Sequence, residues 1–137
     1  MHYIAPLAEP RSHQGLIIFL HGFPDTCYIW EKQLRSRLAE EVKLVALDLP
    51  GCGGSDGLSD YGASSMLNTI AMTISAFRER YELHDGTSAR CVLVSHDWGG
   101  AIASRLAAET VGLIDEVVVV NSTYVGCRTS TMPSSIS

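Results

Sequence analysis

The stretch SHDWGG, residues 95–100, joins a short apolar run, residues 91–95, to an alanine-rich run, residues 101–110. A short apolar run is typical of a buried strand, and alanine favours helix. The order strand, tight turn, helix predicts a nucleophile elbow, in which a strained turn raises its central side chain, here Asp97, above a sheet. The backbone packs closely in such a turn, and the motif supplies the small residues that this requires: Ser95, Gly99 and Gly100.

The rest of the chain alternates strand-like apolar runs with helical patterns. Further strands are predicted over residues 16–20, 43–48 and 117–121, and covering helices over residues 28–40 and 64–81. Strands that alternate with helices imply parallel pairing and right-handed crossovers. We therefore predict an α/β domain over residues 1–125, with a parallel sheet of about four strands and flanking helices. Residues 126–137 are small and polar, which predicts a disordered tail.

Composition excludes several classes of protein. The 137 residues are 46% hydrophobic and 18% charged, and 15 acidic against 10 basic residues give a net charge of -5. This balance argues against a nucleic-acid partner. The first apolar run is too short to cross a bilayer and lacks the flanks of a secretory signal, so we expect a cytoplasmic protein with no membrane partner. No metal site or redox motif is predicted from the cysteines, because they are widely separated: Cys27, Cys52, Cys91 and Cys127.

An aspartate at the centre of the elbow determines which chemistry is available. Its reference pKa is about 3.9, so the carboxylate is ionised near neutral pH. It can attack an electrophilic sp3 carbon directly, opening an epoxide or displacing a halide, and the product is an alkyl ester on Asp97. Hydrolysis of that ester requires a water activated by a histidine, a second carboxylate that orients the histidine, and a site for the developing oxyanion.

The segment HGFP, residues 21–24, supplies a candidate for the oxyanion site. It follows the first predicted strand, where a turn can present one backbone N–H beside the N–H of the residue after the nucleophile. The two donors are then the backbone amides of Phe23 and Trp98.

Three motifs occur in the order and spacing of α/β-hydrolases: HGFPD at residues 21–25, DLPGCGGSD at 48–56 and SHDWGG at 95–100. The chain resembles soluble epoxide hydrolases over residues 14–125, and also haloalkane and fluoroacetate dehalogenases. The resemblance implies that Asp97 is the nucleophile and that the amides of Phe23 and Trp98 form the oxyanion hole. It gives structural roles to five neighbouring residues: His21, Gly22, Pro24, Gly99 and Gly100. It implies no cofactor.

The chain also departs from the family pattern. Ser95 stands where glycine is more usual, and Leu49-Pro50 occupies a place where an arginine often precedes the glycine turn. In the family a lid with activating tyrosines follows, and then the acid and the histidine, but nothing after Asn121 resembles these parts. The resemblance is therefore to the N-terminal half of the fold, without a lid and without an assigned catalytic histidine.

Each of these residues also has a purely structural interpretation. Asp97 could cap the helix that follows it, because aspartate is favoured there. We expect His96 to pack in the core and His21 to make a structural hydrogen bond. The loop of residues 51–57 lacks the order of a phosphate-binding motif, so we interpret it as a tight turn. Trp98 could be a packing residue, a pocket wall or both.

Three functional hypotheses follow. The first is a hydrolase that acts on a small apolar epoxide, or alternatively on a carbon–halogen bond, through an ester on Asp97. The second is a non-catalytic fragment that self-associates through the exposed sheet edge at residues 117–120. The third is a serine hydrolase that uses Ser95 or Ser55, although neither serine is the central residue of the elbow.

Overall fold

A five-stranded sheet lies at the centre of the structure, a computed structural model that describes residues 1–11, 15–84 and 87–122. The strands follow the order β1-β3-β2-β4-β5 across the sheet. Four of them pair in parallel, as predicted. The strands are β1 (Tyr3–Ile4), β2 (Gly15–Leu20), β3 (Lys43–Leu47), β4 (Arg90–His96) and β5 (Glu116–Val120).

The first strand, β1, differs from the prediction. It pairs antiparallel with β3, with Tyr3 opposite Leu47 and Ile4 opposite Ala46. Two residues are too few to show the alternation that identifies a strand in a sequence. The predicted parallel sheet of about four strands therefore gains a fifth, antiparallel strand at its edge.

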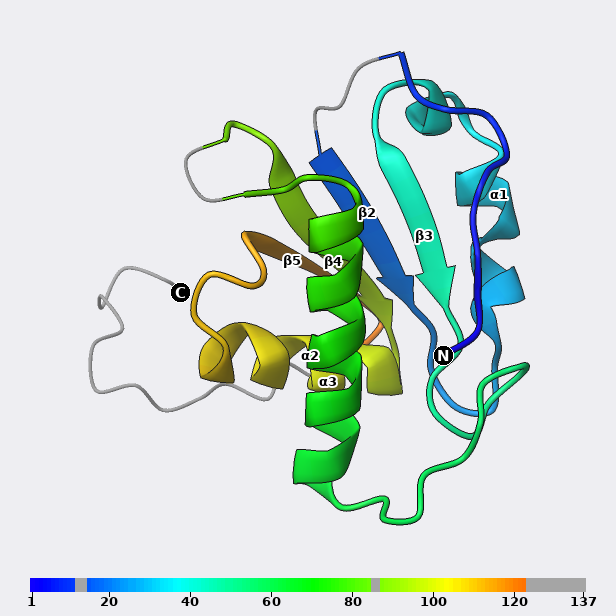
Figure 1. Cartoon of the computed structure of the whole chain (residues 1–137). Coiled ribbons are helices and arrows are strands. Elements are labelled where there is room, and N and C mark those ends of the chain that lie inside the picture. Colours follow the sequence, from blue (N-terminus) through cyan, green and yellow to red (C-terminus); the bar gives the residue numbers. More distant parts are fainter. Residues whose placement is uncertain (12–14, 85–86, 123–137) are drawn as a thin grey trace.

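Helices cover both faces of the sheet, which gives three layers (Figure 1). On one face, alternate residues of β2 (Leu16, Ile18 and Leu20) pack with α2 (Ala63–Arg80) and α3 (Trp98–Glu109). On the other face, Phe19 packs with the buried side chains around α1 (Glu31–Leu34). Since successive side chains of a strand point to opposite faces, the continuous apolar run of β2 fits a strand buried on both sides.

The long helix α2 confirms the predicted helical face over residues 64–81. Its fully or nearly buried residues are spaced three or four apart, as one side of a helix requires: Leu67, Ile70, Ile74 and Phe77. Each such side chain contributes about 1.5–3 kcal/mol when it is removed from water.

The single helix predicted over residues 28–40 is wrong. The segment is divided into a 3-10 turn η1 (Cys27–Trp30), the short α1 and a second 3-10 turn η2 (Arg37–Glu40). Ser36 has extended backbone angles, and its hydroxyl donates to the Gln33 carbonyl oxygen, which ends the helix locally. As a result Ile29 and Leu38, which the pattern places on the buried stripe, are exposed.

Two further predictions concern the C-terminal tail and membrane-spanning segments. The predicted tail, residues 126–137, lies outside the described residues. Within the described ranges, no helix has the length and apolar character needed to cross a membrane.

Candidate active site

The predicted site segments meet at one end of the sheet. β2 lies between β3 and β4, so the chain leaves β2 toward one neighbour and later returns as the other. In α/β sheets the carboxyl ends of two such strands flank a crevice where ligands bind. Residues 21–24 follow β2 and Asp97 follows β4, so both segments lie at this crevice.

Asp97 has a strained backbone conformation between β4 and α3. Its φ of 54° and ψ of -123° are rare for a residue with a side chain. Three hydrogen bonds hold the turn in place. The Asp97 N–H donates to the Val120 carbonyl at 3.3 Å, and the Asp97 carbonyl accepts from the Gly100 N–H at 2.9 Å and from the Ser122 hydroxyl at 2.6 Å. Strain of this kind persists only where the surrounding structure fixes it.

Glycines allow the two segments to come into contact. A Cβ atom at Gly22 would lie 2.5 Å from Oδ2 of Asp97, so the carboxylate packs directly on the Gly22 backbone. A Cβ at Gly99 would lie 2.6 Å from the His21 carbonyl oxygen. Gly100 in turn packs against Ser122. These contacts bring the elbow and the loop after β2 together.

The two predicted amide donors belong to residues with exposed rings. Phe23 is 71% exposed and Trp98 is 64% exposed, while Asp97 is half-buried. Trp98 is the first residue of α3, and the first N–H groups of a helix have no intrahelical partner, so its amide is available to a ligand. The exposure of Trp98 argues against the interpretation of this residue as core packing.

His21 makes the structural hydrogen bonds that the sequence predicts. Its side chain is completely buried; Nδ1 donates to the Gly22 carbonyl at 2.6 Å, and Nε2 accepts from the Leu49 N–H at 2.9 Å. This pattern requires a neutral ring with the proton on Nδ1. The 3.8 Å approach of Nε2 to Asp48 is therefore not an ion pair. His21 connects the loop after β2 to the loop after β3.

A buried carboxylate, Asp48, organises the loop after β3. Its Oδ1 accepts from the Cys27 N–H at 2.7 Å, and its Oδ2 accepts from the Gly54 N–H at 2.9 Å and from His2 Nδ1 at 2.6 Å. Burial raises the pKa of Asp48, but the two backbone donors and His2 outweigh this effect, so the pKa lies below its ordinary value. Asp48 has no role of its own that the sequence predicts, although an acid at the end of an apolar run is a signal.

Asp48 makes the stability of the fold depend on pH. Because its pKa is lower in the folded chain, its stabilisation is complete above the unfolded value of about 3.9 and is lost as the pH falls through the lower folded value. We expect the free energy of unfolding to fall below pH 4, and Asp48→Asn to flatten that dependence. An amide offers one acceptor oxygen in place of two, so one backbone N–H loses its partner, which costs about 1–3 kcal/mol at pH 7.

Urea unfolding at a series of pH values measures this effect. The matched control is Asp60→Asn, because the pKa of Asp60 is also lowered, by the Gly62 N–H and then by Ser65, but its carboxylate is exposed and solvent screens it. An Asp48→Asn curve that parallels the unmodified chain from pH 5 to pH 3 would contradict the assignment.

The structure gives less support to Asp97 as a helix cap and to Ser95 or Ser55 as a nucleophile. The Asp97 side chain makes no capping hydrogen bond to α3. Ser95 is completely buried, and its hydroxyl donates to the Val118 carbonyl at 3.1 Å. Ser55 is 8% exposed, and its hydroxyl donates to the Asp48 carbonyl at 2.7 Å. Nδ1 of His96 is buried and has no hydrogen-bond partner among the described residues.

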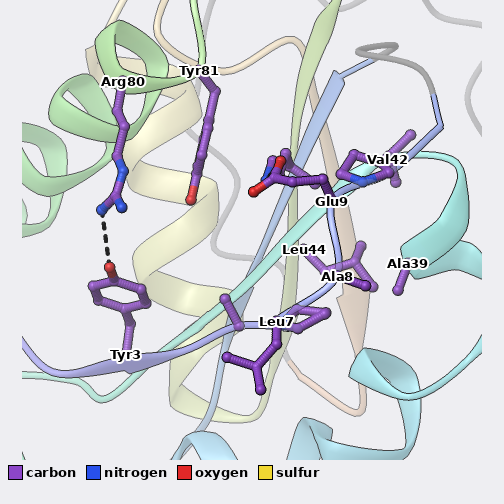
Figure 2. Close-up of a pocket in the computed structure, with 13 residues that line it drawn as sticks. Tyr3, Leu7, Ala8, Glu9, Ala39, Val42, Leu44, Arg80 and Tyr81 are labelled. Atoms are coloured by element: carbon purple, nitrogen blue, oxygen red, sulfur yellow. Dashed lines mark hydrogen bonds and ion pairs between the residues drawn. The ribbon is translucent and has the colours of Figure 1, made fainter.

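A separate cavity of about 280 Å³ lies between the N-terminal segment, β3 and the end of α2 (Figure 2). Its charged side chains are already paired. Arg80 donates to the Tyr3 hydroxyl at 3.0 Å, and Lys43 pairs with Glu9 and lies 5.0 Å from the centre of the Tyr81 ring. None of the predicted site residues lines this cavity.

Comparisons with known proteins agree with the motifs. The model of the Alpha/beta hydrolase family matches residues 17–135. Epoxide hydrolase 3 of Xenopus tropicalis is 35% identical over 124 residues, which cover 90% of this chain and 31% of that protein. Epoxide hydrolase 4 of Mus musculus is 36% identical over 120 residues, with coverages of 88% and 31%. This chain thus spans about a third of the length of these curated relatives.

A solved structure shows the same agreement. The crystal structure of a Bacillus megaterium epoxide hydrolase in complex with an inhibitor superposes with a TM-score of 0.67 at 29% sequence identity. The superposition covers 90% of this chain and 39% of that protein. The described sheet with its helices is therefore part of a larger fold in that enzyme.

Proposed function

The chain belongs to the alpha/beta hydrolase family, and on this premise we propose that it carries the nucleophile and the oxyanion site of an epoxide hydrolase-like enzyme. The observation that carries the proposal is the strained turn at Asp97, whose carboxylate packs against Gly22 at the crevice beside β2. The names of the relatives support an epoxide as the substrate class. The alternative, displacement of a halide by the same carboxylate, has no comparable support in those names.

The first step is an attack of the Asp97 carboxylate on a ring carbon of the epoxide. A bond forms between the carboxylate oxygen and that carbon, the ring C–O bond breaks, and the resulting alkoxide takes a proton from solvent or from a donor. The product is a hydroxyalkyl ester on Asp97. The exposed rings of Phe23 and Trp98 offer apolar surface to a small substrate at this position.

The second step is hydrolysis of that ester. Water adds to the ester carbonyl, and the oxyanion that develops is stabilised by the amides of Phe23 and Trp98. Collapse of the intermediate releases the diol and restores the carboxylate. Two described histidines are unsuited to act as the base, because both ring nitrogens of His21 are engaged and Nδ1 of His2 is bound to Asp48. Since no histidine is assigned as the base, we expect the ester to accumulate in this chain.

Incubation of the chain with a small aryl epoxide tests the proposal. Intact-protein mass spectrometry is expected to show an increase of one substrate mass. Peptide mapping places the modification at Asp97, and hydroxylamine removes an ester but not a thioether on a cysteine. Diol formation by unmodified protein would also support the nucleophile and would show that a base completes the site. Unmodified protein without diol would contradict the proposal.

The exposed sheet edge supports the second candidate function, self-association. Among the described residues, β5 lies at the end of the sheet, and Val118 and Val120 are 46% and 39% exposed. An unpaired strand with apolar side chains pairs readily with another strand. We expect sedimentation velocity to show a dimer that forms with increasing protein concentration, and we expect Val118→Lys to weaken it. A monomer at every concentration would contradict this second function.

A further inference from the structure

Three potential metal ligands from distant parts of the sequence meet beside the crevice. His2 precedes β1, Cys27 is the first residue of η1, and Asp48 directly follows β3. Nδ1 of His2, Sγ of Cys27 and a carboxylate oxygen of Asp48 all lie within 4.8 Å of one another. The N-terminus lies near the carboxyl ends of β2 and β3, which brings His2 to this position (Figure 1).

Two main-chain N–H groups hold the cluster without using the ligand atoms, and the N–H groups of Cys27 and Gly54 donate to the Asp48 carboxylate itself. The His2 N–H donates to the Ser55 hydroxyl at 2.9 Å, and the Asp48 N–H donates to the His2 carbonyl at 3.0 Å. Cys27 and Asp48 are almost completely buried, whereas the His2 side chain is 39% exposed. Because His2 is partly exposed and its side chain can move, an ion can pass it to reach the buried Cys27 and Asp48.

The Cys27 side chain is completely buried beside the Asp48 carboxylate. Burial, and then the neighbouring Asp48, raises the pKa of Cys27 to about 12. A divalent cation can replace the thiol proton of Cys27. It also places a full positive charge beside the buried Asp48 carboxylate, which otherwise contacts only the partial positive charges of N–H groups.

We propose that His2, Cys27 and Asp48 bind one Zn²⁺ ion. Imidazole, thiolate and carboxylate are the three ligand types that zinc takes in proteins, and a tetrahedral site places ligand atoms about 3.3–3.6 Å apart. The pair Nδ1 and Oδ2 is now 2.6 Å apart and must separate slightly, which the partly exposed His2 allows. Water takes the fourth position.

The protons balance in this binding step. Zinc replaces the thiol proton of Cys27, which leaves to solvent. The imidazole of His2 changes tautomer, so that its proton moves from Nδ1 to Nε2 through solvent and Nδ1 becomes a ligand. Oδ2 of Asp48 keeps its bond from the Gly54 N–H and exchanges the His2 donor for the metal. One proton is released for each ion bound.

The ion connects three segments that are far apart in the sequence. It ties the segment before β1 to η1 and to the loop after β3. Spacing along the sequence gave no sign of it. The site is independent of the proposed chemistry at Asp97.

Zinc titration of the reduced, chelator-treated chain against a chromophoric chelator tests the proposal. We expect one Zn²⁺ per chain, a higher Tm with zinc, and a thiolate-to-metal charge-transfer band when Co²⁺ is used instead. Loss of even an indirect partner of a metal ligand lowers affinity about 10–100-fold, so Cys27→Ser and His2→Gln are each expected to lower it by more than about 100-fold.

The matched controls are Cys52→Ser and His84→Gln, which remove the same side-chain types outside the cluster and should bind zinc like the unmodified chain. Circular dichroism verifies that each variant is folded, and His2→Gln alters only a partly exposed side chain. No stoichiometric binding by the unmodified chain, or binding that survives Cys27→Ser, would overturn the proposal. So would an equal loss in the two controls.

Discussion

Replacement of Asp97 by asparagine is expected to abolish the epoxide adduct, with a loss in the rate of ester formation on the order of 10³-fold or more. An amide oxygen carries no full negative charge and cannot form a stable ester with the ring carbon. Asparagine is preferred to alanine because it keeps the size of the side chain and tolerates the positive φ of 54°. Intact-protein mass after a fixed incubation measures the effect.

Asp25→Asn is the matched control for Asp97→Asn. Asp25 belongs to the neighbouring HGFPD segment and has an intermediate exposure like that of Asp97, but it has an ordinary place in the turn, where its N–H donates to the Gly22 carbonyl at 3.0 Å. This variant is expected to form the adduct at an unchanged rate. An adduct of equal yield in the Asp97→Asn chain would show that another group attacks the epoxide.

Gly99→Ala is expected to destabilise the fold by about 1–3 kcal/mol, the usual cost of an added methyl group in a closely packed interior. The new Cβ would lie 2.6 Å from the His21 carbonyl oxygen and 2.9 Å from the Leu20 carbonyl oxygen. Both are backbone atoms and cannot rotate away, so the elbow must move from β2. Urea unfolding measures the change in the free energy of unfolding.

Gly62→Ala provides the comparison for the glycine variant. Its Cβ would lie 3.1 Å from a carboxylate oxygen of Asp60, the end of an exposed side chain that can move, and its φ of -57° suits any residue. We expect a change of less than about 0.5 kcal/mol. Equal stability of the Gly99→Ala chain and the unmodified chain would argue against close contact between the elbow and the loop after β2.

Local patterns in the sequence were enough to predict most of the fold. The apolar runs that became β2, β3, β4 and β5 are short and bounded by turn residues, and α2 has a clear helical face. The turn at Asp97 was predictable because strand, small residues and helix follow one another without a break. These elements depend on residues that are adjacent in the sequence, so one sequence is enough to predict them.

Features that depend on distant residues could not be predicted. β1 is a strand only because it meets the edge of β3, more than 40 residues away. The break at Ser36 arises from a competition between a hydroxyl and the backbone that helical spacing does not reveal. His2 contacts Asp48 and Gly22 contacts Asp97, but each pair is far apart in the sequence. Such contacts leave no local pattern from which they could be predicted.

The central place of β2 has a consequence for the order in which the protein takes shape during synthesis. β2 is made first among its neighbours, yet it pairs with β3 on one side and with β4 on the other. One of its edges therefore stays open on the ribosome until residues 90–96 have emerged. The same event delivers Asp97 beside Gly22, so the closing of the sheet and the assembly of the crevice are one late step of folding, governed by contacts of long sequence separation.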